Sequence, residues 1–269
     1  MMNMLYAVFT EIFVEWFKGL KKRIRKAAGS YGFTCDGCGA ELFDYPVHRL
    51  CKTCEDGLRF NNGRTCDKCG RKTLAEGVCL SCKGRAPRFD KGISPFVYRG
   101  ESASFVNRIK TSNPTLALYF AEKMAECFIE RFVDAERFLQ EDIGPLLLIP
   151  VPLTKARMRE RGYNQAELLA ERVSDVLQEK GYRVELREDI LLKKKDTAQQ
   201  KHMDFTSRLE NVAGAYHVAK RKECRGRTVL LIDDILTTGA TGSECASRLL
   251  SAGADRVVFL TGASLPEQK

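Results

Sequence analysis

The sequence predicts an α/β domain built on a parallel, doubly wound sheet, preceded by a small metal-binding module. Three observations lead to this fold class. Val229–Ile232 is a continuous apolar run, which is typical of a parallel strand covered on both faces. Predicted strands alternate with predicted helices through the second half of the chain. Eight of the 11 cysteines form four C-x-x-C pairs, which points to bound metal.

Length and composition limit the class of protein. A chain of 269 residues is long enough for one sizeable domain and a small module. Its 44% hydrophobic and 29% charged residues are typical of globular proteins, and no apolar run reaches the ~20 residues that span a bilayer. Because no export signal is recognisable, we expect a reducing cytoplasm, in which paired cysteines bind metal rather than form disulfides. The net charge of +9 favours an anionic partner without identifying it.

Residues 1–34 are expected to form an amphipathic helix and a linker. Apolar side chains recur there every three or four residues, and a basic run, Lys18–Lys26, follows them. One interpretation is a helix docked on its own protein or on a partner. The other is a membrane-surface anchor through residues 1–26, which would put the protein at the inner face of the membrane.

Residues 35–86 are expected to fold around two zinc ions. Two cysteines three positions apart can reach one tetrahedral ion from a tight turn, and two such turns complete a structural site. The eight candidate ligands are Cys35, Cys38, Cys51, Cys54, Cys66, Cys69, Cys79 and Cys82. We favour the first four on one ion and the last four on the other, and an interleaved arrangement stays open. So few large apolar residues accompany them that metal is needed to stabilise the module.

Residues 87–269 carry the predicted α/β domain. Strands are expected at Phe96–Arg99, Leu146–Val151, Val229–Ile232 and Val257–Leu260, and helices at Pro114–Phe132, Gln165–Glu179 and Thr241–Ser251.

The stretch from Val229 to Thr241 is predicted to bind a phosphorylated ribose. A buried strand leads to two adjacent carboxylates, Asp233 and Asp234, and ligands of open α/β sheets bind at that edge. A loop then leads into a helix, whose first N–H groups can bind a phosphate. The predicted ligand residues are Asp233, Asp234, Thr237, Thr238, Gly239, Ala240 and Thr241. The acids would accept from ribose hydroxyls or act through Mg²⁺. The alternative is the nucleotide-binding loop of another α/β fold.

Two further segments are candidates for the same site. The first follows the strand that ends in Pro-Val-Pro, and would bring backbone donors and cations to a diphosphate. Its candidates are Val151, Pro152, Lys155, Arg157 and Arg161, and the alternative is a solvated basic helix start. The second resembles a mobile loop that could close over a ligand. Its candidates are Lys193, Lys195, Gln199 and Gln200.

The acid–threonine–glycine loop resembles the phosphoribosyl diphosphate (PRPP) signature of type I phosphoribosyltransferases. The whole chain from Cys35 to about Ala263 resembles the ComF family of competence-associated proteins. The likeness rests on the four C-x-x-C pairs, R-I-K ending at Lys110, the Pro-Val-Pro segment with R-x-R-G-Y-N-Q, and D-D-I-L-T-T-G-A-T. It implies a double zinc ribbon fused to a phosphoribosyltransferase fold, PRPP bound with Mg²⁺, and a cytoplasmic role with single-stranded DNA in natural transformation.

Three functions remain open from the sequence. The first is a PRPP-binding protein that assists DNA uptake, and its expected partners are single-stranded DNA and a competence helicase-type protein. The basic groups around residues 155–161, 193–195 and 220–227 would follow the DNA backbone. The second is an active phosphoribosyltransferase, for which no acceptor site or general base is recognisable. The third is a PRPP-sensing regulator without turnover.

Overall fold

The computed structural model describes residues 34–42, 49–132, 135–140, 144–194 and 212–267. The chain divides into two compact units, residues 1–51 and 52–269. The predicted helix in residues 1–34 lies outside the described residues, apart from its last position. The domain boundaries predicted after residue 34 and after residue 86 stay predictions. Among the described residues, no helix is both long and apolar enough to cross a membrane.

The described part of the first unit centres on a tight turn between Thr34 and Glu41, which pair as an isolated antiparallel bridge. Gly39 takes a positive φ of 79° and donates its N–H to the carbonyl of Cys35 at 2.8 Å. A turn of the same design recurs in the second unit, where Thr65 pairs with Lys72 and Gly70 has a φ of 70°. The two cysteine turns therefore share one backbone design.

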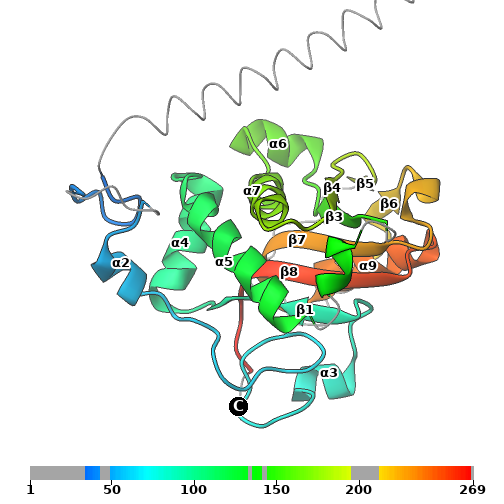
Figure 1. Ribbon diagram of the computed structural model, residues 1–269, viewed down its shortest axis with the longest axis horizontal. Helices are drawn as coiled ribbons and strands as arrows, with labels where there is room; N and C mark the ends of the chain where they lie inside the picture. Colours follow the sequence, from blue (N-terminus) through cyan, green and yellow to red (C-terminus); the bar gives the residue numbers. More distant parts are fainter. Residues whose placement is uncertain (1–33, 43–48, 133–134, 141–143, 195–211, 268–269) are drawn as a thin grey trace, which may run out of the picture. The chain divides into compact units, whose positions relative to one another are not determined.

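The second unit is built on a parallel sheet with the strand order β1-β8-β7-β3-β4, and β2 also pairs with β8 (Figure 1). The strands are β1 (Lys91–Ile93), β2 (Phe96–Val97), β3 (Leu146–Pro150), β4 (Val184–Leu186), β7 (Thr228–Leu236) and β8 (Arg256–Ser264). A separate antiparallel pair consists of β5 (Leu191–Lys193) and β6 (Tyr216–Val218). The predicted parallel α/β class is confirmed.

Helices cover both faces of this sheet. The helix α7 (Gln165–Glu179) packs on β3, β4 and β7, and α5 (Leu116–Arg131) packs on β8 and on α7. The helix α9 (Ala240–Ser251) packs against β7, β8 and β6. The remaining helices are α2 (Lys52–Asp56), α3 (Leu80–Gly84), α4 (Gly100–Thr111), α6 (Lys155–Arg161), and the short 3-10 turns η1 (Ala135–Leu139) and η2 (Arg221–Cys224).

The core explains why these segments form strands and helices. Alternate residues of a strand face opposite sides of the sheet, and both sides of β3, β7 and β8 are buried. On the α9 side, Val229, Leu231 and Phe259 pack with Cys245 and Leu249 in one cluster. Gly242 is required there, because a Cβ on it would lie 2.4 Å from the ring of Phe259. The second group of cysteines belongs to the same buried cluster.

Several boundaries differ from those predicted. The strand β7 continues to Leu236 and contains both acids, because β8 pairs with it as far as Ser264. Its other neighbour, β3, ends earlier, since Pro150 pairs with Ile232. The chain just after β3 therefore runs beside Asp233 and Asp234. The predicted strand at 96–99 shortens to two residues, and α7 has the predicted bounds.

Candidate functional site

Two groups of four cysteines have the geometry of tetrahedral metal sites. The sulfur atoms of Cys35, Cys38, Cys51 and Cys54 lie within 4.8 Å of one another, and so do those of Cys66, Cys69, Cys79 and Cys82. The grouping is sequential rather than interleaved. Four thiolates about 2.3 Å from a zinc ion lie about 3.8 Å apart. The Sγ atoms of Cys69 and Cys79 are 3.8 Å apart, and those of Cys38 and Cys51 are 3.7 Å apart.

Backbone N–H groups point at these sulfur atoms, as metal-bound thiolates require. Cys35 Sγ accepts from the N–H groups of Gly37 and Cys51, at 3.3 and 3.1 Å. Cys66 Sγ accepts from the N–H groups of Cys69 and Cys79, at 3.5 and 3.3 Å. Such donors stabilise negative charge on sulfur. All four ligand positions of each site are filled by protein, so zinc bound there would stabilise the fold and leave no position open for a substrate.

The two acids of β7 face opposite sides of the sheet. Asp234 is 3% exposed, and its Oδ2 lies 2.7 Å from Nζ of Lys110 at the end of α4. Asp233 is also buried, and its Oδ1 accepts from the N–H of Asp234 at 2.9 Å. Burial raises the pKa of the Asp233 carboxyl to about 6, and the charges of Lys110, Lys193 and Arg161 offset part of the rise. Burial also lowers the pKa of Lys110 below its usual value.

The loop after β7 leads directly into α9. Gly239 has a φ of 80°, a left-handed conformation that suits glycine, and it begins the helix. The N–H of Ala240 donates to the hydroxyl of Thr238 at 3.3 Å. The first N–H groups of a helix lack partners within the helix, and its dipole favours an anion at this end. Thr237, Thr238 and Thr241 are all partly accessible, as a ligand would need.

The predicted diphosphate segment lies beside the acids, but its residues have different surroundings. The N–H of Val151 donates to the carbonyl of Ile232 at 2.8 Å, which holds Val151 and Pro152 next to the end of β3. Thr154 then caps α6 by accepting from the N–H of Arg157. Within α6, Arg157 pairs with Glu160 at 3.1 Å and Lys155 is exposed, as in a solvated helix. Arg161 is the member of this segment whose charge reaches Asp233.

Of the predicted loop residues, Lys193 lies near the acids. It ends β5, and its Nζ lies 5.2 Å from the ring centre of Tyr216, in β6. Tyr216 is buried, and its hydroxyl is hydrogen-bonded to the side chain of Thr241. Burial raises the pKa of Tyr216, and the charges of Cys245 and Asp233 raise it further by smaller amounts. The other three predicted loop residues, Lys195, Gln199 and Gln200, lie outside the described residues.

Sequence reasoning noted Lys110 only as the end of the R-I-K motif and did not single out Tyr216 or Arg71, although all three contact the site. Lys110 follows Val106 by four positions on the buried face of α4, which is the signal that could have identified it. Tyr216 carried no motif. Arg71 lies in the second cysteine module, and its Nη2 donates to the carbonyl of Thr237 at 3.1 Å.

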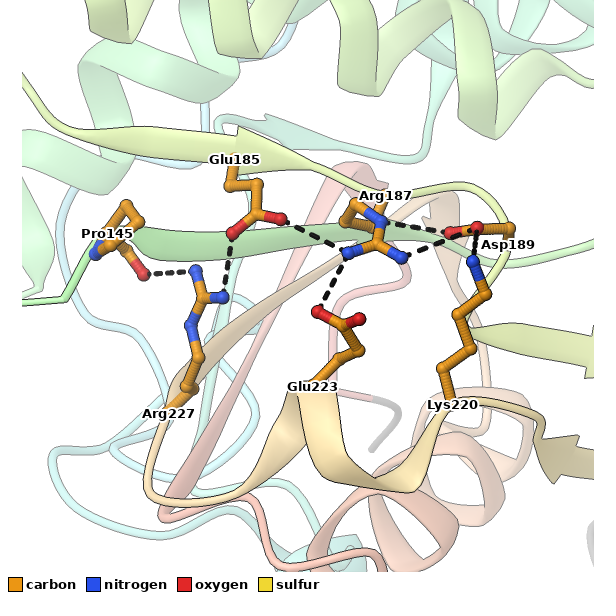
Figure 2. A network of polar contacts seen from close by, with 7 residues as sticks. All are labelled: Pro145, Glu185, Arg187, Asp189, Lys220, Glu223 and Arg227. Carbon is orange, nitrogen blue, oxygen red and sulfur yellow. Dashed lines mark hydrogen bonds and ion pairs between the residues drawn. The ribbon is translucent and has the colours of Figure 1, made fainter.

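The basic stretch from Lys220 to Arg227 is largely engaged within the protein (Figure 2). Arg227 pairs with Glu185 at 2.7 Å and donates to the carbonyl of Pro145 at 2.7 Å. Lys220 pairs with Asp189, which also pairs with Arg187 at 3.0 Å. Arg187 in turn pairs with Glu223 at 2.9 Å. These contacts fasten the edge strand β4 to η2, so they weaken the interpretation of this stretch as a DNA-binding track.

Comparisons with known proteins agree with the motifs. No protein-family model matches the chain. Competence protein F of Haemophilus influenzae is 28% identical over 229 residues, which cover 84% of this chain and 95% of the relative. Competence protein ComFC of Bacillus subtilis is 27% identical, covering 77% of this chain and 80% of the relative. DNA utilization protein YhgH of Escherichia coli is 24% identical, covering 77% and 87%.

The matching solved structures are more distant. The allosteric regulatory enzyme of purine biosynthesis is 18% identical with a TM-score of 0.33, and the match covers 60% of this chain and 30% of that chain. A hypoxanthine-guanine phosphoribosyltransferase from Schistosoma mansoni is 14% identical with a TM-score of 0.29, covering 57% and 67%. The fold class rests instead on the strand order and register described above. Curated relatives named for competence and for DNA utilization match most of their own length and most of this chain, so the protein is similar to the ComF competence proteins along most of its sequence.

Proposed function

We propose that this protein binds PRPP or a related ribose 5-phosphate ligand with Mg²⁺, and that it assists the handling of single-stranded DNA during DNA uptake in the cytoplasm. One observation carries the first part. Two adjacent buried carboxylates and the Gly239 loop follow each other at the carboxyl end of the central strand, with three cations close to Asp233. This order of groups matches a ligand that has a diol in its middle and phosphate at both ends.

Each group has a distinct part in binding. Asp233 and Asp234 accept hydrogen bonds from the ribose hydroxyls, because ionised carboxylates are acceptors only. The hydroxyls of residues 237–241 and the first N–H groups of α9 donate to the 5-phosphate. Arg161 and the backbone around Val151 lie toward the diphosphate end.

Magnesium would bind mainly through the ligand. The carboxylate oxygens of the two acids are the donors that Mg²⁺ prefers, directly or through its waters, and they fit such an ion. The ion supplies positive charge that neutralises the diphosphate. Because Lys110 already pairs with Asp234 Oδ2, Asp233 and the oxygens of the ligand are the better candidates to hold it.

The second part of the proposal rests on the relatives, whose names refer to competence and to DNA utilization. We also propose that residues 1–26 contact a helicase-type protein or a membrane surface. These residues lie outside those that the structure describes.

Titration calorimetry with PRPP and Mg²⁺ tests the ligand. The double variant Asp233→Asn, Asp234→Asn should lose affinity by about a hundredfold or more, because two charge-assisted hydrogen bonds are lost. It should retain two zinc ions per chain, since the cysteines are untouched. Asp189→Asn, in the Figure 2 network, is the matched control and should bind PRPP like the wild type. Unchanged affinity in the double variant would refute the site.

Fluorescence anisotropy with a labelled single strand tests the second part. Affinity for DNA should fall steeply as salt increases, because cations on the protein replace counterions along the backbone. Affinity that does not depend on salt, or no binding at all, would contradict the proposal. Release of diphosphate from PRPP only in the presence of an added base would instead favour the transferase.

A further inference from the structure

The side chain of Arg71 connects the second cysteine group to the loop that follows β7. Arg71 is 7% exposed. Its Nε donates to the Sγ of Cys69 at 3.2 Å, and its Nη2 donates to the carbonyl of Thr237 at 3.1 Å. A guanidinium holds its donors in one rigid plane, so the positions of the sulfur and of the carbonyl are fixed relative to each other.

The turn that carries Arg71 is itself anchored to the sheet. Gly92 of β1 donates its N–H to the carbonyl of Lys68 at 2.8 Å. A Cβ on Gly70 would lie 2.1 Å from the carbonyl oxygen of Gly92, so the two backbones touch. The strand β1 pairs with β8, and β8 pairs with β7, so the turn is anchored to the sheet that carries the 237–241 loop. The loop is therefore held both by β7, which precedes it, and by the hydrogen bond from Arg71.

The end of the chain adds a second connection. After β8, the N–H of Leu265 donates to the carbonyl of Leu236, at the end of β7, at 2.9 Å. Glu267 then accepts from the N–H of Leu80 at 2.8 Å and donates its own N–H to the carbonyl of Lys72 at 2.9 Å. The second cysteine group is therefore integrated into the structure that supports the loop, rather than attached beside it.

The duplicated turn shows that the arginine is not needed to make a cysteine turn. In both turns the N–H of the first cysteine donates a hydrogen bond to the carbonyl of the residue five positions later. Cys35 donates to Ala40 at 2.7 Å, and Cys66 donates to Arg71 at 2.9 Å. The first copy thus has alanine where the second has Arg71. A turn of the same hydrogen bonding and the same positive-φ glycine forms without this side chain. The extra function of Arg71 is its contact with Thr237.

We propose that Arg71 is a positioning residue that fixes the 237–241 loop to the second cysteine group, so that the metal state of this group and the conformation of the loop are thermodynamically linked. The four sulfur atoms fit zinc, as described above, and a metal-bound Cys69 presents a fixed, negatively charged acceptor to Arg71. Loss of the ion would free Cys69 and hence the loop. The consequence for phosphate binding rests on the proposed function, but the link itself does not.

Hydrogen–deuterium exchange of the full-length protein tests the link without any ligand. Arg71→Ala introduces the residue that the first turn already carries, so it should retain two zinc ions per chain. The peptide that spans residues 236–243 should exchange about tenfold faster, as expected for the loss of one charge-assisted hydrogen bond. Peptides of β8 should not change. Arg64→Ala is the matched control, because Arg64 lies in the same module and donates to the carbonyl of Leu74 at 3.4 Å.

Two outcomes would overturn the proposal. Equal exchange of the loop in Arg71→Ala and wild type would show that Arg71 does not position it. Loss of one zinc ion in Arg71→Ala would show that the side chain holds the metal site instead. A chelator experiment then separates this proposal from the proposed function. If PRPP binds at the loop, it should slow the release of one of the two zinc ions in the wild type but not in Arg71→Ala. If PRPP has no effect in either protein while the exchange result holds, the ligand assignment fails and the link stands.

Discussion

Lys110 and Asp234 form an ion pair of 2.7 Å at the end of the central strand, with the lysine side chain 23% exposed and the aspartate side chain 5% exposed. Asp234 Oδ2 has no other hydrogen-bond partner among the described residues, so the charge of Lys110 offsets the cost of burying this oxygen. The pair places a cation against one carboxylate, next to Asp233, a second acid whose pKa is raised. It also reduces the negative charge that an incoming phosphate would meet.

Lys110→Met tests this relationship. The variant leaves a buried carboxylate without its cation, so the free energy of unfolding should fall by about 2–4 kcal/mol. The affinity for PRPP should fall as well, because the net charge at the acids becomes more negative. Urea denaturation and calorimetry measure the two effects. Lys123→Met is the control, because it removes a partly exposed helical pair with Glu126, whose side chain is 43% exposed, and should cost less than about 1 kcal/mol. Equal losses in both variants would refute the role of Lys110.

The raised pKa of Asp233 makes stability depend on pH. Its pKa rises from an ordinary 3.8 to about 6 in the folded protein, where Lys110, Lys193 and Arg161 face it. Between these values the folded state holds a proton that the unfolded chain releases. The free energy of unfolding therefore falls as pH rises from about 4 to about 6, by on the order of 2–3 kcal/mol, and this contribution stays constant above that range.

Denaturation of wild type and Asp233→Asn across this range isolates the effect, because other groups titrate equally in both. The difference between the two stabilities should shrink or change sign as pH rises. Asp189→Asn is the control. Arg187 and Lys220 lower the pKa of Asp189 to about 2, so its contribution changes below about pH 4 and not in the tested range. A difference that does not vary with pH for Asp233→Asn would contradict the burial of its charge.

Sequence patterns predicted the elements that carry their own periodicity or motif. The helix at Gln165–Glu179 has a clear apolar stripe and a buried Asn164 that caps it, so even its bounds were predicted. The cysteine spacing predicted both cysteine groups and favoured the sequential grouping that the structure has. The end of β7 could not be predicted, because it depends on pairing with β8 and not on the local residues Asp233–Leu236.

The candidate site shows the same division. The loop at 237–241 was predicted because its chemistry is contiguous in the sequence. Lys110, Arg71 and Tyr216 approach the loop and its acids from three separate elements, and no local pattern reports such convergence. The basic stretch at 220–227 was interpreted as a surface for DNA, but its acidic partners are distant in the sequence and only the fold brings them together.

Gly239→Ala should affect ligand binding more than its cost in stability suggests. A residue with a Cβ at a φ of 80° costs about 1–2 kcal/mol, and there is room for the methyl group, since the nearest atom is a Phe89 carbon at 3.9 Å. The strain would be relieved by moving the loop, so the affinity for PRPP should fall about tenfold. Calorimetry and denaturation measure both.

Gly226→Ala provides the comparison for this variant. Gly226 has a φ of 65° and open space around it, so the same strain arises away from the acids. Its stability should fall by a similar amount while its affinity for PRPP stays at the wild-type value. A loss of affinity in Gly226→Ala as large as in Gly239→Ala would mean that general destabilisation, and not the loop, weakens binding.

Arg227 should stabilise the edge of the sheet rather than bind a ligand. Its guanidinium joins Glu185 in β4 to the carbonyl of Pro145, just before β3, at 2.7 Å each. Arg227→Met breaks both contacts, so the free energy of unfolding should fall by about 1–2 kcal/mol in urea denaturation. Affinities for PRPP and for single-stranded DNA should not change, because the cation is already engaged by protein acceptors. Lys222→Met removes an exposed lysine of the same stretch and should leave stability within about 0.5 kcal/mol of wild type. If Arg227→Met instead retained full stability and lost DNA binding, the network in Figure 2 would have to open to receive the strand.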